Sequence, residues 1–215
     1  MPSEMASSKN FGVRKREAIG IVKSMVEVEC PRQVSCADLL ILAAREAVAM
    51  SGGPWIRVPL GRRDSVTTSY ELADASLPPS NTGVDGMLHI LGEKGMTVEE
   101  SEGEHAAEMD PGFEAFLKLS CPQGSLTSNS SFVGNDLTDF VFDNQYYRDT
   151  MGGRGVLKID AYMAMDPRTA PIMAHFANNK DDFYQAFISA FVKLSSTGVL
   201  TGNQGVVRKS CNAID

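Results

Sequence analysis

SCADLLILAAREAVAMSGGPWIRVPLGRRD, at residues 35–64, predicts one apolar helix followed by a folded loop, around which the rest of the chain is expected to pack. Ser35 and Asp38 have the spacing of a capping box just ahead of the apolar run. The helix is apolar on nearly all sides, and such a helix is predicted to be buried. The Gly-Gly-Pro at residues 52–54 ends it, because glycine allows a left-handed C-terminal residue and proline cannot continue a helix.

Asp38 is an unusual residue in the first turn of so apolar a helix. A buried carboxylate is costly unless it is paired, and the basic residues of the following loop, Arg62 and Arg63, are the obvious partners. The alternative is an Asp38 that faces solvent, because an acidic side chain is favourable near any helix N-terminus.

Length, charge and composition restrict the class of protein. A chain of 215 residues without a Pro/Gly/Ser-rich linker predicts one domain over residues 10–215, after a disordered start at residues 1–9. A net charge of −7 argues against nucleic acid and against an anionic membrane surface as partners. No apolar run reaches the roughly 18 residues of a membrane span. The start has no signal-peptide pattern, so the chain as written is expected in the cytosol.

Four cysteines occur, at positions 30, 36, 121 and 211. They are too widely spaced for a zinc site, whose ligands come in pairs a few residues apart. An oxidised framework is the better interpretation for a secreted protein. The glycosylation triplet Asn129-Ser130-Ser131 favours the same interpretation.

The spacing of apolar residues predicts further helices. They are expected at about 11–29, 84–93, from 97 onward, 111–120, from 166 onward, and from about 181 to a stop at Gly198. The helix at 111–120 is predicted to be buried through Phe113, Phe116 and Leu117.

Several motifs together resemble one family. Five stretches are similar to segments of the plant secretory (class III) haem peroxidases: VSCADLLILAAREAV, GGP, VPLGRRDS, LPPS and NDLTDFVFDNQYY. The similarity continues, with one break, from about Lys9 to the last residue. The resemblance implies a mainly α fold, a haem-peroxidase-like helical domain that is here incomplete. It also implies the family's reaction, in which hydrogen peroxide oxidises the haem iron and phenolic donors reduce it, in peroxide removal and the oxidative-stress response.

Cofactors, partners and location follow from the same resemblance. It implies haem b and calcium as cofactors, hydrogen peroxide and small phenolic donors as partners, secretion, and a monomer. Nucleic acid and membrane are not expected partners.

Two segments of the family have no counterpart at the matching positions. The chain is expected to begin after the distal helix, whose Arg and His lie over the haem iron. The Gly-Ala-His-Thr stretch that holds the iron is missing where Ser101 meets Glu102. No catalytic residue is therefore assigned, and haem binding and activity by this chain are expected to be poor or absent. The alternatives to a peroxidase are a non-catalytic remnant that lacks both haem-pocket histidines and a calcium-binding structural protein.

None of the three histidines is expected to replace the missing ligand. His105 lies in an acidic, polar stretch that suits a solvated side chain and not a haem ligand in a dry pocket. His89 and His175 lie on predicted helices, where a surface or satisfied histidine is the commoner outcome. The three also share no ligand spacing such as i, i+4.

The resemblance assigns two residues to the haem surroundings. Pro78 matches the substrate-binding proline at the haem edge. The alternative interpretation of Leu-Pro-Pro is a plain extended turn, because proline biases the preceding residue away from helix. Asp160 matches the residue that accepts a hydrogen bond from the proximal histidine. With that histidine missing, the sequence offers Asp160 no partner.

A partial calcium site is also implied. Thr138, Val141 by its carbonyl oxygen, and Asp143 match ligand positions, and Asp136 is a stand-in for the leading Asp of the family, which falls on Asn135. Calcium binds six to eight oxygens, so the set is short of ligands. The alternative role for Asp143 is to cap the helix that follows it.

Two structural pairs complete the assignment. The resemblance favours Asp38 with Arg62, and it pairs Cys36 with Cys211. The family partners of the cysteines at 30 and 121 would lie in the missing segments, so these two are expected to be free thiols.

Overall fold

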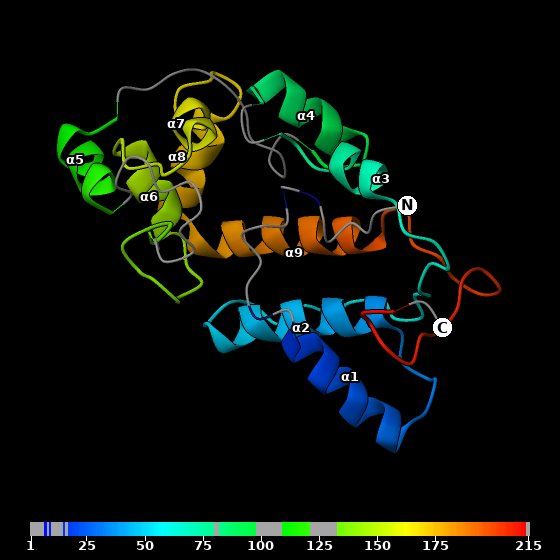
Figure 1. The fold of residues 1–215 in the computed structure, drawn as a ribbon. Helices are drawn as coiled ribbons and strands as arrows, with labels where there is room; N and C mark the ends of the chain where they lie inside the picture. The colour runs from blue at the N-terminus through cyan, green and yellow to red at the C-terminus, as the bar shows by residue number, and fades with distance from the viewer. Residues whose placement is uncertain are drawn as a thin grey trace. The chain divides into compact units, whose positions relative to one another are not determined.

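The structure is a computed structural model that describes residues 7, 9, 15, 17–79, 82–97, 109–120 and 133–213. These residues are mainly α-helical, as the sequence predicts, and their only β pairing is two isolated bridges, Arg63 with Leu200 and Asp64 with Val206. The helices in Figure 1 are α1 (Glu17–Glu29), α2 (Cys36–Met50), α3 (Tyr70–Ala75), α4 (Val84–Gly92), α5 (Pro111–Ser120), α6 (Gln145–Met151), α7 (Lys158–Met163), α8 (Ala170–Asn178) and α9 (Lys180–Ser196).

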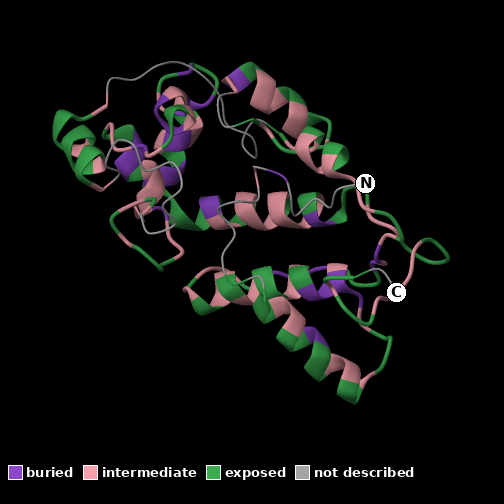
Figure 2. Ribbon diagram, in the orientation of Figure 1, coloured by how far each residue is buried: buried purple, intermediate pink, exposed green. Residues whose placement is uncertain are grey.

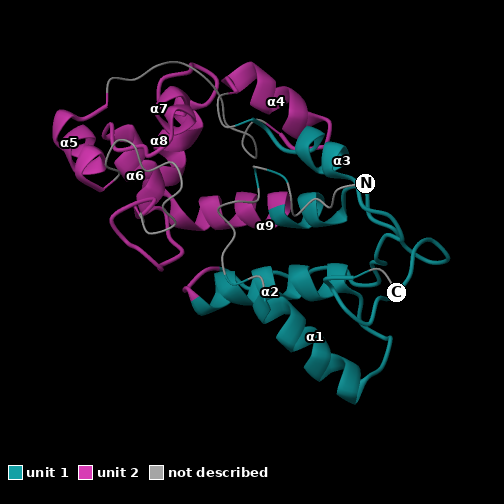
Figure 3. Cartoon of the chain, in the orientation of Figure 1, with its two compact units in different colours: residues 1–50, 54–79, 191–215 teal, residues 51–53, 80–190 magenta. Residues whose placement is uncertain are grey.

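The chain divides into two compact units, which Figure 3 colours separately. Unit 1 comprises residues 1–50, 54–79 and 191–215, and unit 2 comprises residues 51–53 and 80–190. The single domain expected over residues 10–215 stays a prediction. The disordered start expected at residues 1–9 lies outside the described residues, except for Ser7 and Lys9.

The start of α2 is held by two side chains. The N–H of Asp38 donates to Ser35 Oγ at 3.0 Å, as a cap at Ser35 requires. Asp64 supplies a second cap, since its two carboxylate oxygens accept from the N–H groups of Cys36 at 3.0 Å and Ala37 at 2.9 Å. The first-turn donors of the helix are thereby satisfied, and the loop of residues 54–64 is tied to the helix N-terminus.

The prediction that α2 is buried on nearly all sides is wrong. Of its apolar side chains, only Cys36 and Leu39 are buried, whereas Leu40 is 50% and Met50 is 86% exposed. Figure 2 shows buried residues gathered at the N-terminal part of α2, and exposed and intermediate residues along the rest. Within unit 1, α1 packs against α2, and this contact covers only part of the surface of α2.

Helix α5 has the predicted bounds but not the predicted burial. None of its residues is buried, and Phe116 is 52% exposed. Phe113 and Phe116 lie side by side instead, with ring centroids 6.1 Å apart. An apolar stripe thus fixes where this helix forms, but it does not fix how much of the helix other elements cover.

Other helix boundaries differ by a few residues. The first helix starts at Glu17, and residues 11–14 and 16 lie outside the described part. Helix α8 starts at Ala170 and not at Asp166, because Asp166 closes a turn by accepting from the N–H of Arg168 at 2.8 Å. The helix expected from residue 97 onward lies almost wholly outside the described residues. Helices α3 and α7 were not predicted.

In unit 2, α6 packs against both α7 and α8, and α7 also packs against α4. The core of these contacts contains Met173 and Phe176 of α8, with exposed fractions of 0% and 4%. Phe183 of α9 is buried as well. Among the described residues, none of the helices combines the length and the apolar composition that crossing a membrane requires.

Candidate functional site

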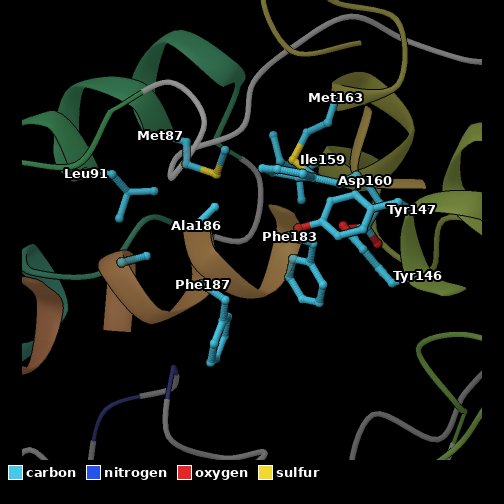
Figure 4. Close-up of a pocket in the computed structure, with 12 residues that line it drawn as sticks. Met87, Leu91, Tyr146, Tyr147, Ile159, Asp160, Met163, Phe183, Ala186 and Phe187 are labelled. Atoms are coloured by element: carbon cyan, nitrogen blue, oxygen red, sulfur yellow. The ribbon is translucent and has the colours of Figure 1, made fainter. Parts of the chain in front are cut away.

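A cavity of about 340 Å³ lies within unit 2, and five helices form its walls. The residues that line it are Met87 and Leu91 of α4, Tyr146 and Tyr147 of α6, Ile159, Asp160 and Met163 of α7, Phe176 of α8, and Phe183, Ala186, Phe187 and Ala190 of α9. Figure 4 shows Met87 and Leu91 on one side and Asp160 with the two tyrosines on the opposite side. A concave, mostly apolar space with a few polar groups is typical of small-molecule sites.

One wall of the cavity is a cluster of aromatic rings. The ring of Tyr147 meets Phe176 and Phe183 edge to face, with centroid distances of 5.4 and 5.1 Å. Phe183 in turn meets Phe187 at 6.1 Å. Edge-to-face pairs are a favoured arrangement of aromatic rings, so this wall is a packed, rigid surface.

Asp160 supplies the carboxylate of the cavity lining. Its side chain is buried, and it accepts two hydrogen bonds, from the hydroxyl of Tyr146 to Oδ1 at 2.8 Å and from the N–H of Leu157 to Oδ2 at 2.7 Å. The expectation that Asp160 has no partner is therefore wrong. Gly155 approaches so closely that a Cβ there would lie 2.6 Å from Asp160 Cβ, and the chain thus has room for the carboxylate only because residue 155 is glycine.

The histidines lie away from this cavity wherever the structure describes them. His89 of α4 is exposed, with its Nε2 3.6 Å from Glu93 Oε1. His175 of α8 is also exposed, with its Nε2 2.8 Å from Asp182 Oδ2. Both are surface histidines, as the sequence favours. His105 lies outside the described residues.

The predicted calcium ligands converge in one loop. The hydroxyl of Thr138 lies 3.0 Å from Asp136 Oδ1 and 3.1 Å from Asp143 Oδ1, and the N–H of Val141 donates to the Thr138 carbonyl. Asp143 Oδ1 also accepts from the N–H of Gln145 at 2.8 Å, at the start of α6, so the capping role is present too. Among the described residues, no group of three or more His, Cys, Asp or Glu side chains is placed to hold a metal ion.

A buried carboxylate that the sequence did not single out supports this loop. Asp149 of α6 is 1% exposed and accepts from the N–H of Leu137, from Gln145 Nε2 and from Arg154 Nη2, at 2.9, 3.0 and 2.5 Å. Burial raises the pKa of Asp149, but the hydrogen bonds from Arg154 and the other donors outweigh it and hold that pKa below its usual value. No sequence pattern marks Asp149, because its partners are set by the path of the loop.

The remaining predicted residues lie in unit 1. Arg62 Nη1 is 3.0 Å from Asp38 Oδ1, and both side chains are buried. The other carboxylate oxygen of Asp38 accepts from the N–H of Gly61 at 2.7 Å, while Arg62 Nε donates to the carbonyl of Ser195 at 2.7 Å. Asp38 therefore does not face solvent. Pro78 lies in the irregular segment after α3, in unit 1, whereas the cavity belongs to unit 2.

The cysteine pairing implied by the resemblance is present. Cys36 and Cys211 form a disulfide with a Cα–Cα distance of 5.6 Å. Cys30 is a free thiol, as expected. Cys121 lies outside the described residues.

Comparison with known proteins gives one consistent result. A family model described as Peroxidase matches residues 1–179. Peroxidase 29 of Arabidopsis thaliana is 48% identical over 99% of this chain and 71% of its own length, and Peroxidase 28 of the same plant is 34% identical over 99% and 74%. A basic peroxidase of Zinnia elegans is 35% identical over 97% of this chain and 71% of its own length.

The length of these alignments shows that the relatives and this chain differ in residue number. The alignment with Peroxidase 29 runs over 240 positions, more than the 215 residues of this chain. That relative therefore has residues without a counterpart here inside the aligned stretch, in accord with the break in the resemblance. The match of the family model, the identities and the mainly helical structure lead to one conclusion: the chain belongs to the peroxidase family, among the plant secretory peroxidases.

Proposed function

We propose that this chain is a peroxidase-family domain that keeps the family's helical fold without the family's haem ligation, and that by itself it does not turn over peroxide. The observation that carries the proposal is the hydrogen bond from the Tyr146 hydroxyl to Asp160, the residue matched to the family's acceptor for the proximal histidine. Here the carboxylate is engaged by a phenol of the same unit.

The residues of the cavity do not fit a histidine-ligated haem. Such a haem needs an imidazole on the iron and a carboxylate that accepts from the other ring nitrogen, which makes the ligand more basic. Among the described residues, no histidine lines the cavity, whose walls offer thioethers, phenols and hydrocarbon side chains. The carboxylate that would orient the imidazole accepts from Tyr146 and Leu157, and none of the described histidines donates to it.

The alignment length supports the same proposal. The resemblance puts its break where Ser101 meets Glu102, and at that point the family has the helix with its iron ligand. Residues present in the relatives but without a counterpart in this chain accord with the loss of that helix. We therefore propose that the chain is a stable helical domain that binds another molecule, and that its cavity lacks the histidine that ligates the haem iron in the family.

The second candidate is the family's own reaction, which family membership favours. It is the oxidation of small phenolic donors by hydrogen peroxide, in peroxide removal and the response to oxidative stress, by a secreted monomer with haem b and calcium. Pro78 would then contact the donor. This candidate needs an iron ligand from outside the described residues, and His105 is the histidine of the chain that lies there.

A peroxidase assay separates the two candidates. Purified chain is mixed with haemin, hydrogen peroxide and guaiacol, with free haemin as the blank and Peroxidase 29 as the positive control. The proposal predicts no turnover above free haemin. Saturable turnover that disappears in His105→Ala and persists in the control variant His89→Ala would contradict it and establish His105 as an adopted ligand.

We also propose that the loop of Asp136, Thr138, Val141 and Asp143 binds calcium weakly. The closeness of the Thr138 hydroxyl to both carboxylates supports an oxygen-rich site. Calcium needs more oxygens than these residues offer, and Asp143 is partly engaged in capping α6.

A further inference from the structure

In the part of the chain that the structure describes, Asp160 of the unit 2 cavity has no cationic partner. Asp160 is 5% exposed, and both of its partners, the Tyr146 hydroxyl and the Leu157 N–H, are neutral donors. Among the described residues, no Lys, Arg or His side chain lines the cavity. A carboxylate has about four acceptor positions, so two hydrogen bonds leave capacity on its oxygens for a further donor from within the cavity.

The wall next to this carboxylate is suited to positive charge. The faces of aromatic rings carry partial negative charge, and they attract cations most strongly where water is excluded. Tyr147, Phe183 and Phe187 supply such rings around the same space as Asp160. On the opposite side, Met87 and Leu91 offer only apolar surface (Figure 4).

The size of the cavity limits the ligand. About 340 Å³ is near the lower end of the roughly 300 to 1,000 Å³ of ligand sites, so the space suits a molecule with a single ring. From charge, ring chemistry and size, we propose that this cavity binds a small aromatic cation, whose ammonium group donates to Asp160 and whose ring packs among the aromatic side chains. The inference rests on the proposed loss of haem ligation, because a proximal imidazole would donate to the same carboxylate.

Other ligand classes fit the cavity less well. An anion would be repelled by Asp160 and by the net charge of −7. A neutral hydrocarbon would fill the apolar part of the cavity, but it has no donor for the free acceptor positions of Asp160. An unpaired buried acceptor is costly. A compact organic cation satisfies both the polar and the apolar walls.

The test uses two probes of nearly equal shape. Benzylammonium carries the charge, and benzyl alcohol replaces the ammonium by a neutral hydroxyl. The complete chain is titrated with each probe at neutral pH by ligand-observed NMR. We expect benzylammonium to bind with a dissociation constant of about 1 mM or tighter, and benzyl alcohol to bind at least about tenfold more weakly.

Three variants assign the site. Asp160→Asn keeps the shape of the side chain and removes its charge, and it should weaken benzylammonium about tenfold or more while leaving benzyl alcohol unchanged. Asp181→Asn, in the exposed first turn of α9, removes the same charge at a distance and should leave both probes unchanged. Ala186→Leu fills the cavity and should weaken both probes.

Three outcomes overturn the inference. These are equal affinity for the two probes, a benzylammonium affinity that Asp160→Asn does not reduce, and binding that Ala186→Leu leaves intact. If circular dichroism shows that Asp160→Asn does not fold, two measurements still test the inference. These are the comparison of the two probes on the parent chain and the binding of both probes to Ala186→Leu.

Discussion

Removal of the Cys36–Cys211 disulfide should cost this protein a large part of its stability. The bond joins residues 175 positions apart, nearly the whole chain. In the chain-entropy model, opening a loop of this length returns about 5 kcal/mol of conformational freedom to the unfolded state. Domains are typically stable by only about 5 to 15 kcal/mol. The double variant Cys36→Ala/Cys211→Ala is therefore expected to be destabilised by several kcal/mol.

Urea unfolding of oxidised protein, of the double variant and of Cys30→Ala measures this effect. Cys30→Ala is the matched control, because it removes a cysteine that forms no disulfide. The double variant should also show a steeper dependence on urea, since an unfolded chain without the cross-link exposes more surface. A loss below about 1 kcal/mol would refute the reasoning from loop closure. Peptide mapping that found Cys30 bonded to Cys121 would contradict the pairing itself.

Two further predictions concern the loop before α6. Because the ligand set is incomplete, calcium at a concentration near its dissociation constant should stabilise the protein by about 0.4 kcal/mol. Addition of a chelator should then lower the melting temperature by about 1 to 2 °C. A large chelator effect that vanishes in Asp143→Ala would show a complete site. The pKa of Asp149 is lowered in the folded state. The contribution of the ionised Asp149 to stability should therefore be complete above the usual aspartate pKa of about 4. This contribution should be lost as the pH falls through the pKa that Asp149 has in the folded state. Unfolding of the parent chain and of Asp149→Asn between about pH 2 and 7 checks this, and an equal loss of stability with acid in both would disprove the role of Asp149.

Much of the helical framework could be predicted from local sequence. The apolar run and the Ser35 cap determine where α2 starts, because both are read within one turn of the chain. Short helices escape such reasoning. α3 and α7 have six residues each, too few for an apolar period to repeat.

Burial could not be predicted in the same way. An apolar stripe shows which face of a helix can be covered but not what covers it, and Leu40 and Phe116 are exposed although their helices form where expected. The partner of Asp160 was missed for a related reason. Tyr146 lies on another helix, and no spacing rule joins a residue of α6 to one of α7.

The most direct test of the central claim is the Soret spectrum of the purified chain titrated with haemin. The hydrogen bond between Tyr146 and Asp160, together with a cavity wall that has no histidine among the described residues, predicts a spectrum that matches haemin bound non-specifically and that does not saturate at one equivalent. A saturable spectrum of five-coordinate, histidine-ligated haem at one equivalent would contradict the claim and would mean that this chain holds haem as its family does.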